Sequence, residues 1–512
     1  MDRRDFVRSG SALLALALAP SGSSASLAED APAAAAPPPF SRTWLIEEAR
    51  RLAGNPYQAP PEKLPDEVAK MTYDAYRDIR FRPEARLWGS ENLPFALDLF
   101  HPGFYFRTPV HISVVDNGVA TELSFSPDLF EYGPQAKRPD SPDGLFFTGL
   151  RVRAKINTPD VWDEFLVFQG ASYFRAIARD QLYGLSARAV AIDTAEPKGE
   201  EFPAFTHFWI IKPDPHADTL TIHALLDSPS MTGAYQFTVI PGGETVITVE
   251  GTIFARQEIT KLGIAPLTSM FVFDASNRNG HDDFRPAAHD SDGLQMLTSS
   301  GEWVWRQLAN PRDLQLSAFA DTRPRGFGLM QRKRRYEDFE DLEAAYERRP
   351  SLWIEPMGDW GKGFVELVEI PTANEYNDNI VAYWRPDGHV PVGGPYNYAY
   401  RMRWTDVVKP GKALLTVQQT RIGLTTTDGK RRLFVIDFDA PVGVDTKTLA
   451  VDASASAGAL GAPVIHEGAP DRTVRVSFDL DTSGIELSEL RLRLTAGGAP
   501  ASETWLYRWT AR

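Results

Sequence analysis

Two polar clusters hold the side chains best suited to chemistry. Residues 281–293 follow the apolar stretch 270–273, and residues 375–379 follow a strand-like stretch that ends at Pro371. Each cluster is therefore expected on a loop at the edge of a sheet, where functional groups often gather. A carboxyl beside apolar residues can keep its proton, while a second carboxylate accepts one. Two such carboxyls are the smallest set of groups that glycosyl transfer needs.

Each cluster also has a simpler interpretation. Residues 290–293, Asp-Ser-Asp-Gly, resemble half of a calcium-binding loop, but the further oxygen ligands and the later glutamate of such a loop are missing. Asp and Gly also suit a backbone turn, and Asp378 suits an Asx turn between two strands. Taken alone, each segment favours the turn. We predict no metal site.

The composition excludes several classes of function. The 512-residue chain has no cysteine, which excludes thiol catalysis, zinc–thiolate sites and disulfide bonds. A net charge of −14 without a basic stripe argues against nucleic acid as a partner and suits a neutral ligand. Beyond the N-terminus, no apolar run is long enough to span a membrane. Carboxyl chemistry of the kind above requires no cofactor.

The N-terminus predicts export. Arg3 and Arg4 form a twin-arginine pair, followed by an apolar run over residues 12–19 and by small residues ending at Ala28. This pattern predicts a signal peptide over residues 1–28 for the Tat route, and therefore a periplasmic protein. Residues 29–39 form an Ala/Pro linker.

The elements that position the polar clusters are predicted to be mainly strands. Ser41 can cap a helix that ends near Gly54, a second helix is expected over 65–76, and residues 336–349 carry a helical apolar face that predicts a helix or lid. Short alternating segments joined by Gly/Pro turns dominate the remainder, which predicts an all-β fold with a large antiparallel sandwich. These predicted strands include 110–114, 151–156, 165–168, 205–211, 220–226, 235–240, 246–254 and 364–370.

A stretch rich in Pro and Gly, residues 386–395, indicates a domain boundary. About seven short strands follow it. We therefore predict a catalytic β-sandwich domain over 40–388 and an immunoglobulin-like β-sandwich over 396–512.

Five stretches of the chain resemble the periplasmic glucan biosynthesis proteins G and D (the OpgG/OpgD, or MdoG/MdoD, family). The resemblance extends from about Phe40 to the C-terminus, and the twin-arginine signal favours the D branch. The five stretches are residues 164–175, 265–270, 289–294, 358–363 and 377–384.

The resemblance implies a fold, an activity and two catalytic residues. The fold is a large N-terminal β-sandwich of the galactose-mutarotase-like kind with a smaller immunoglobulin-like domain. The activity is that of an inverting endo-β-1,2-glucanase in the synthesis of osmoregulated periplasmic glucans. On the family's pattern Asp378 is the general acid, and Asp290 is the general base, acting through a relay of water and a sugar hydroxyl.

The chemistry of the neighbouring residues completes the predicted site. We expect six of them to orient the aspartates or to contact β-1,2-glucan: His289, Arg285, Glu375, Tyr346, Trp360 and Trp384. Tryptophan is more often a core residue than a sugar platform. Two alternatives stay open: an inverting transglycosylase that cyclises the glucan, and a non-catalytic glucan-binding scaffold. The sequence leaves the oligomeric state open, a homodimer included.

Overall fold

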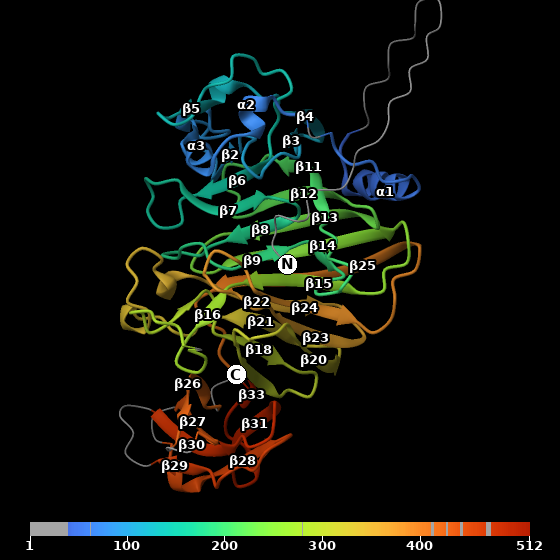
Figure 1. The fold of residues 1–512 in the computed structure, drawn as a ribbon. Coiled ribbons are helices and arrows are strands. Elements are labelled where there is room, and N and C mark those ends of the chain that lie inside the picture. Colours follow the sequence, from blue (N-terminus) through green and yellow to red (C-terminus); the bar gives the residue numbers. More distant parts are fainter. Residues whose placement is uncertain are drawn as a thin grey trace, which may run out of the picture. The chain divides into compact units, whose positions relative to one another are not determined.

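The computed structural model describes residues 39–61, 63–278, 280–410, 414–425, 429–440, 444–466 and 473–511. The predicted signal peptide, and the predicted linker except Pro39, lie outside these residues. Strands make up most of the described chain, and Figure 1 follows them from the blue to the red end of the sequence. The predicted all-β class is confirmed.

A ten-stranded sheet forms one layer of the larger part of the fold, and its neighbouring strands all pair antiparallel. On β8 the side chains of Phe174 and Ala176 are buried while Tyr173 and Arg175 project from the other face, as a period of two requires. In spatial order the strands are β2 (Phe95–Leu99), β6 (Gly149–Ala154), β7 (Asp163–Gln169), β8 (Tyr173–Ala176), β9 (Ser186–Arg188), β15 (Leu262–Ser269), β24 (Ile380–Pro386), β23 (Lys362–Glu369) and β20 (Gln315–Thr322), with β10 (Val190–Ile192) also on β15.

A fifteen-stranded sheet forms the second layer and continues into the C-terminal part. Two of its pairs are parallel, β3 with β11 and β19 with β33. In spatial order its strands are β28 (Leu449–Ala455), β31 (Leu487–Ala496), β33 (Thr504–Thr510), β19 (Trp303–Gln307), β18 (Gly293–Leu297), β21 (Gly326–Met330), β22 (Ser351–Met357), β25 (Gly393–Thr405), β14 (Thr245–Ala255), β13 (Met231–Ile240), β12 (Leu220–Asp227), β11 (Ala204–Ile211), β3 (His111–Asp116) and β4 (Val119–Glu122), with β32 (Ala499–Pro500) on β31.

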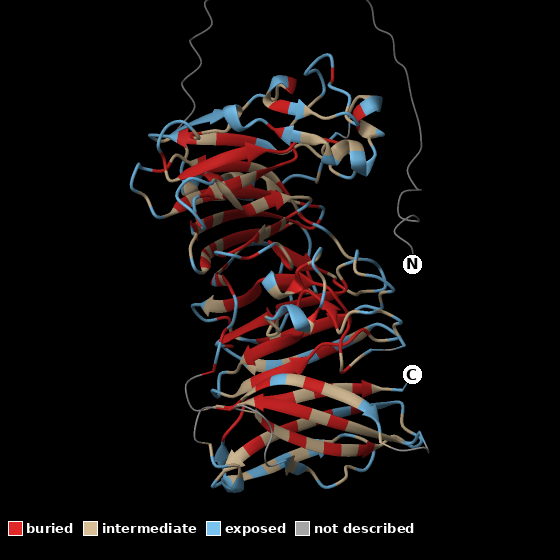
Figure 2. Ribbon diagram, turned by 90° about the vertical axis from the view of Figure 1, so that its left-hand side faces the viewer, coloured by how far each residue is buried: buried red, intermediate tan, exposed pale blue. Residues whose placement is uncertain are grey.

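The two layers enclose a large hydrophobic core. The ring of Phe168 on β7 lies 5.1 Å from that of Phe237 on β13, so the two sheets touch directly. Figure 2 shows the buried residues concentrated on the strands and the exposed ones in the connections. Burial of this apolar surface is the main force that holds the sandwich together.

A second core lies in the C-terminal part, between a four-stranded sheet and the end of the large sheet. Its centre is Phe434, which stacks on Phe478 at 5.2 Å and meets Trp505 of β33 at 6.2 Å. The four strands are β26 (Thr416–Leu424), β27 (Arg431–Asp439), β30 (Thr473–Asp481) and β29 (Val464–His466). Strand β25 spans the predicted boundary and pairs with β14 and β22, and the division into two domains stays a prediction.

The helices are few and short. Helix α1 (Arg42–Ala53) begins as predicted, because Ser41 Oγ accepts the N–H of Trp44 at 3.1 Å. The predicted second helix is instead two, α2 (Asp66–Ala69) and α3 (Tyr73–Arg77), because Thr72 between them caps a new helix. The remaining elements are the 3₁₀ turns η2 (Pro83–Ala85), η3 (Pro127–Leu129), η4 (Tyr336–Asp338), η5 (Tyr346–Arg348) and η6 (Thr446–Thr448), and the strand pairs β1 (Ile79–Phe81) with β5 (Phe130–Tyr132) and β16 (Phe271–Phe273) with β17 (Ala288–His289).

The prediction of a helix over residues 336–349 is wrong. Only η4 and η5 form there, with Glu340 and Ala345 in the left-handed region of the backbone. The carboxylate of Asp341 accepts the N–H groups of Glu343 and Ala344, which favours a turn over helical hydrogen bonding. Phe339 and Tyr346 of the predicted apolar face are still buried, but Leu342 of the same face is 85% exposed. The periodic pattern therefore marked burial only in part, and no helix.

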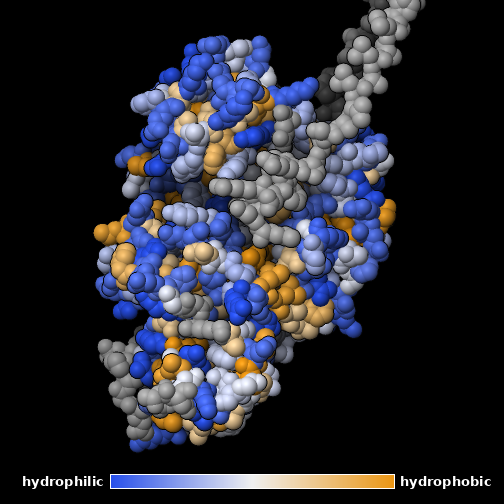
Figure 3. Space-filling model, viewed as in Figure 1, coloured by the Kyte–Doolittle hydropathy of each residue, from blue (hydrophilic) through white to orange (hydrophobic). Residues whose placement is uncertain are grey.

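The described helices include none that is both long and apolar enough to cross a bilayer. The face of the molecule drawn in Figure 3 is mainly hydrophilic, with smaller hydrophobic patches between the blue areas.

Candidate active site

The two predicted catalytic aspartates flank one stretch of backbone. The N–H of Asp290 donates to the carbonyl of Met270 at 2.8 Å, and the N–H of Asn379 donates to the carbonyl of Ser269 at 3.0 Å. Ser269 Oγ also donates to Ser291 Oγ at 2.8 Å. The end of β15 therefore lies between the loop that carries Asp290 and the residue that follows Asp378, and it brings the two together.

Asn379 fixes this arrangement. Its Oδ1 accepts the N–H of Phe271 at 2.8 Å, and its Nδ2 donates to the carbonyls of Phe271 and Ile370, each at 3.0 Å. The side chain is buried, so these hydrogen bonds are shielded from water. Sequence reasoning did not single out Asn379, although it stands inside the 377–384 stretch.

Asp290 lies in a buried, charged environment. The residue is 4% exposed, and its carboxylate is ion-paired with Arg349. Burial raises the pKa of the Asp290 carboxyl, and the charge of Asp378 raises it further. The guanidinium groups of Arg349 and Arg175 lower the same pKa. Asp378 is thus close enough to Asp290 to affect the pKa of the Asp290 carboxyl.

Asp378 has more contact with water. Its side chain is 32% exposed, and its Oδ2 lies 3.8 Å from a guanidinium nitrogen of Arg175 on β8. The two carboxyls therefore have unlike surroundings, one buried against an arginine and one open to solvent. Sequence reasoning missed both arginines as site residues, although Arg175 closes the 164–175 stretch and Arg349 closes the predicted lid.

Glu375 joins residues from three parts of the chain. Tyr346 donates its hydroxyl to Glu375 Oε2 at 2.5 Å, and Arg285 donates to the same oxygen at 2.9 Å. Arg285 also donates to Asp341 at 2.8 Å. Burial raises the pKa of Tyr346, and Glu375 raises it further. These bonds connect residues 336–349 to the two acidic loops, and they place Tyr346 and Glu375 side by side.

His289 lies behind the site. Its ring is buried between Phe271, at 5.3 Å, and Phe339, at 5.0 Å. Its Nε2 lies 3.5 Å from Lys333 Nζ. Burial lowers the pKa of His289 well below its ordinary value, and the Lys333 charge lowers it further. The described contacts of His289 and of Arg285 are thus with residues other than Asp290, which is oriented by Arg349 instead.

Asp292 is a second buried carboxyl of this loop. Its Oδ1 accepts the N–H of Arg332 at 3.3 Å. Burial raises the pKa of Asp292 to about 6, Asp274 contributes in the same direction, and Lys333 and Arg332 oppose them. Within the described residues no three or more His, Asp or Glu side chains are grouped to hold a metal ion.

The two predicted tryptophans belong to the core. Trp384 is 0% exposed, and Trp360 packs on it at 6.3 Å and on Tyr400 at 6.1 Å. The indole N–H of Trp360 donates to the carbonyl of Ala399 at 3.1 Å. A buried indole has no free face for a sugar, so we leave both residues out of the site.

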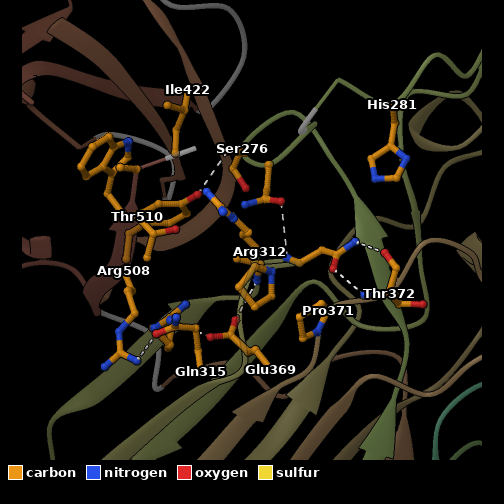
Figure 4. A pocket seen from close by; sticks show the side chains of 18 of the residues that line it. Ser276, His281, Arg312, Gln315, Glu369, Pro371, Thr372, Ile422, Arg508 and Thr510 are labelled. Atoms are coloured by element: carbon orange, nitrogen blue, oxygen red, sulfur yellow. Dashed lines mark hydrogen bonds and ion pairs between the residues drawn. The ribbon is translucent and has the colours of Figure 1, made fainter. Parts of the chain in front are cut away.

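A cavity of about 530 Å³ lies beside the loops that lead to both aspartates. Figure 4 shows Arg508, Gln315 and Glu369 on one side of it, and His281 and Thr372 on the other. Neither Asp290 nor Asp378 lines this cavity. It is therefore separate from the candidate active site.

Comparison with known proteins places the chain in a family. A model of the family described as "Periplasmic glucan biosynthesis protein, MdoG" matches residues 40–509. The chain is 46% identical over 473 residues to Glucans biosynthesis protein G of Shewanella sp. (strain W3-18-1), covering 92% of this chain and 87% of the relative. It is 44% identical over 473 residues to Glucans biosynthesis protein G of Vibrio cholerae serotype O1, with the same coverage.

A solved structure, that of the Slr1438 protein from Synechocystis sp. PCC 6803, covers 47% of this chain and 92% of its own at 7% identity. Its TM-score of 0.24 is too low to carry an argument. The family match and the relatives, in contrast, extend over nearly the whole described chain. The chain belongs to the MdoG family of periplasmic glucan biosynthesis proteins.

Proposed function

We propose that this protein is a periplasmic endo-β-1,2-glucanase that cleaves its substrate with inversion. The observation that carries the proposal is the meeting of Asp290 and Asp378 in unlike surroundings, in a chain of a glucan biosynthesis family. Inverting glycosidases need one carboxyl that donates a proton and another that accepts one. The first role goes to Asp378 on the family's pattern, and its side chain, 32% exposed, can exchange protons with solvent between turnovers.

The proposed reaction balances its protons between the two carboxyls. Asp378 gives its proton to the glycosidic oxygen as the bond to the anomeric carbon breaks. Water attacks that carbon from the opposite face, and the proton that water loses passes to Asp290 through a relay of water and a sugar hydroxyl. The charge of Arg349 lowers the pKa of Asp290 against the effect of burial, which favours the ionised form that accepts this proton.

The other residues of the site have supporting roles in this proposal. Glu375, with a side chain 32% exposed, can bond sugar hydroxyls, and Tyr346 and Arg285 hold its carboxylate in place. His289 fills the space behind the Asp290 loop, where it packs on Phe271.

Incubation of the purified protein with linear β-1,2-glucan tests the proposal. Shorter chains with new reducing ends, released first as the α-anomer, support the inverting hydrolase. If cyclic glucan forms without new reducing ends, the protein is an inverting transglycosylase and not a hydrolase. If the protein binds glucan but leaves it unchanged, the proposal of an enzyme is overturned and the glucan-binding scaffold is favoured.

We also propose export by the Tat route, on the twin-arginine pair Arg3 and Arg4. Replacing both with lysine is expected to keep the precursor in the cytoplasm, as cell fractionation would show. A processed periplasmic product from that variant would favour another route. The relatives named above are G proteins, and the assignment to the D branch stays a prediction.

A further inference from the structure

A second concave site lies at the turn between β7 and β8. It is a cavity of about 300 Å³, and neither Asp290 nor Asp378 lines it. This size falls at the lower end of the range for small-ligand sites. Its walls are unusually rich in aromatic rings, which include Tyr57, Tyr105, Phe106, Tyr173, Phe202 and Phe205.

Two of these rings are open to solvent. Tyr105 is 81% exposed and Phe202 is 52% exposed, although large aromatic side chains are usually buried. An exposed aromatic face beside a cavity offers the flat apolar surface on which a sugar ring stacks. The cavity therefore offers the kind of aromatic surface that a sugar ring can use.

The walls of this cavity are held in place. Arg188 lies over the ring of Tyr173 at 5.2 Å and over that of Phe202 at 5.7 Å. Its guanidinium is fixed in turn by Glu200 at 2.5 Å and by Thr268 at 3.1 Å. The two rings are therefore oriented before any ligand arrives, which lowers the entropy cost of binding.

The cavity is close to electrically neutral. Asp227 lines it, but its carboxylate is paired with Arg256 at 2.7 Å. The other charged lining residue is Arg107, and the remaining polar groups are uncharged, such as Thr108 and Gln169. An uncharged ligand that carries hydroxyl groups suits this lining better than an anion or a cation.

The turns that form the cavity contain unfavourable backbone conformations. Phe104 and Ala171 have φ values of 54° and 46°, and Gly170 between β7 and β8 has a φ of 80°. Positive φ is rare for a bulky residue such as phenylalanine, because its side chain then crowds the backbone. Such residues cluster at ligand sites, where the surrounding structure holds them.

The cavity and the candidate acid lie on the same face of β8. Tyr173 lines the cavity, and Arg175, two residues along the strand, lies 3.8 Å from Asp378. Residues two apart on a strand point to the same face and are about 7 Å apart. A chain bound at Asp378 can therefore continue along β8 past Arg175 to the aromatic cavity.

We propose that the aromatic cavity at the β7–β8 turn is a sugar-binding subsite that holds a stretch of the glucan chain away from the reacting bond. The inference rests on the proposed function for the identity of the sugar. The subsite makes the protein prefer long chains over short ones, because only a long chain reaches both the aspartates and the cavity.

Calorimetric binding of linear β-1,2-glucan to the Asp378→Asn variant tests this subsite without turnover. Adding Tyr105→Ala or Phe202→Ala is expected to weaken binding of long chains roughly three- to tenfold, the worth of one aromatic contact. Tyr105→Phe keeps the ring and is expected to bind as the parent does. Leu487→Ala, an apolar change at a residue that is 39% exposed on β31, serves as a control outside the cavity.

The outcomes separate this inference from the proposed function. A smaller advantage of long over short chains in both alanine variants supports the subsite. Unchanged long-chain affinity, equal losses for short and long chains, or no glucan binding by the parent overturns it. Turnover of glucan by the wild-type protein is measured separately. Its absence overturns the glucanase even where the cavity binds sugar.

Discussion

The guanidinium of Arg349 is ion-paired with the buried carboxylate of Asp290. The same group lies over the ring of Tyr346 at 4.3 Å and donates to the carbonyl of Ala344. Gly184 allows this approach, because a Cβ there would lie 2.9 Å from the Cβ of Arg349. These contacts fix the position of the arginine, and the arginine in turn holds the carboxylate of Asp290 in one orientation.

Replacing Arg349 with alanine is expected to lower kcat/KM for β-1,2-glucan at least about tenfold at neutral pH. The guanidinium of Arg349 lowers the pKa of Asp290, whereas burial and Asp378 raise it. Without Arg349 the pKa of Asp290 should therefore rise, and less of the base should be ionised. The acidic limb of the pH–rate profile should therefore move to higher pH. Arg348→Ala, at the exposed neighbouring residue, is the control. An unshifted limb in the Arg349 variant would contradict the role given to the ion pair.

Replacing Asp378 with asparagine is expected to reduce turnover by about 10²-fold or more, because an amide cannot supply the proton. The melting temperature should change little, since the side chain is partly exposed. Asp387→Asn, an exposed residue at the other end of β24, is the matched control. Release of reducing ends measures the effect, and normal turnover by the Asp378 variant would remove this residue as the acid.

Replacing Asn379 with alanine should cost stability as well as activity. The change leaves the buried N–H and carbonyl of Phe271 without their partners, at about 1–3 kcal/mol. Urea unfolding measures this cost, and the exposed Asn377→Ala is its control. Because Asn379 connects the loops of both aspartates, kcat should fall in the folded fraction too. If the variant were as stable and as active as the wild type, the hydrogen bonds of Asn379 would not be needed to hold the two loops.

Asp292 predicts a pH dependence of stability. Its pKa is raised from 3.8 to about 6 in the folded protein, so the folded state binds more protons than the unfolded state over this interval. Stability should therefore fall as pH rises from about 4 to about 6, by up to about 3 kcal/mol. Asp292→Asn, which mimics the neutral carboxyl, should flatten the fall in melting temperature, whereas the exposed Asp313→Asn should not. If the melting temperature fell equally with pH in both variants, Asp292 would not be the cause of the fall.

The sequence predicted the class of fold and the loops of the site because both depend on local signals. Alternating apolar residues identified the strands, and the polar clusters after 270–273 and before β24 identified the loops of Asp290 and Asp378. Their convergence depends on the pairing of β15 with β24 and on the bonds of Ser269 and Met270. The sequence of one strand does not show which distant strand it will pair with.

The arginines and tryptophans could not be assigned from the sequence for the same reason. Arg349 is ion-paired with Asp290, which lies 59 positions away in the sequence. The residues next to Arg349 contain no pattern from which this partner could be predicted. A tryptophan such as Trp384 could serve as a sugar platform by residue type. It lies on a central strand, however, where its side chain is buried. Which face of a strand meets the core is decided by the opposite sheet.

The parallel pairing of β19 with β33 has a consequence for biogenesis. Val304 pairs with Thr504, so a strand from the middle of the chain has its neighbour near the very end. Both strands must leave the ribosome before this part of the sheet can close, although N-terminal regions usually fold first. A transporter that accepts only compact cargo would therefore have to wait until strand β33 has been synthesised, and a chain that ends before Thr504 should yield a product that it rejects.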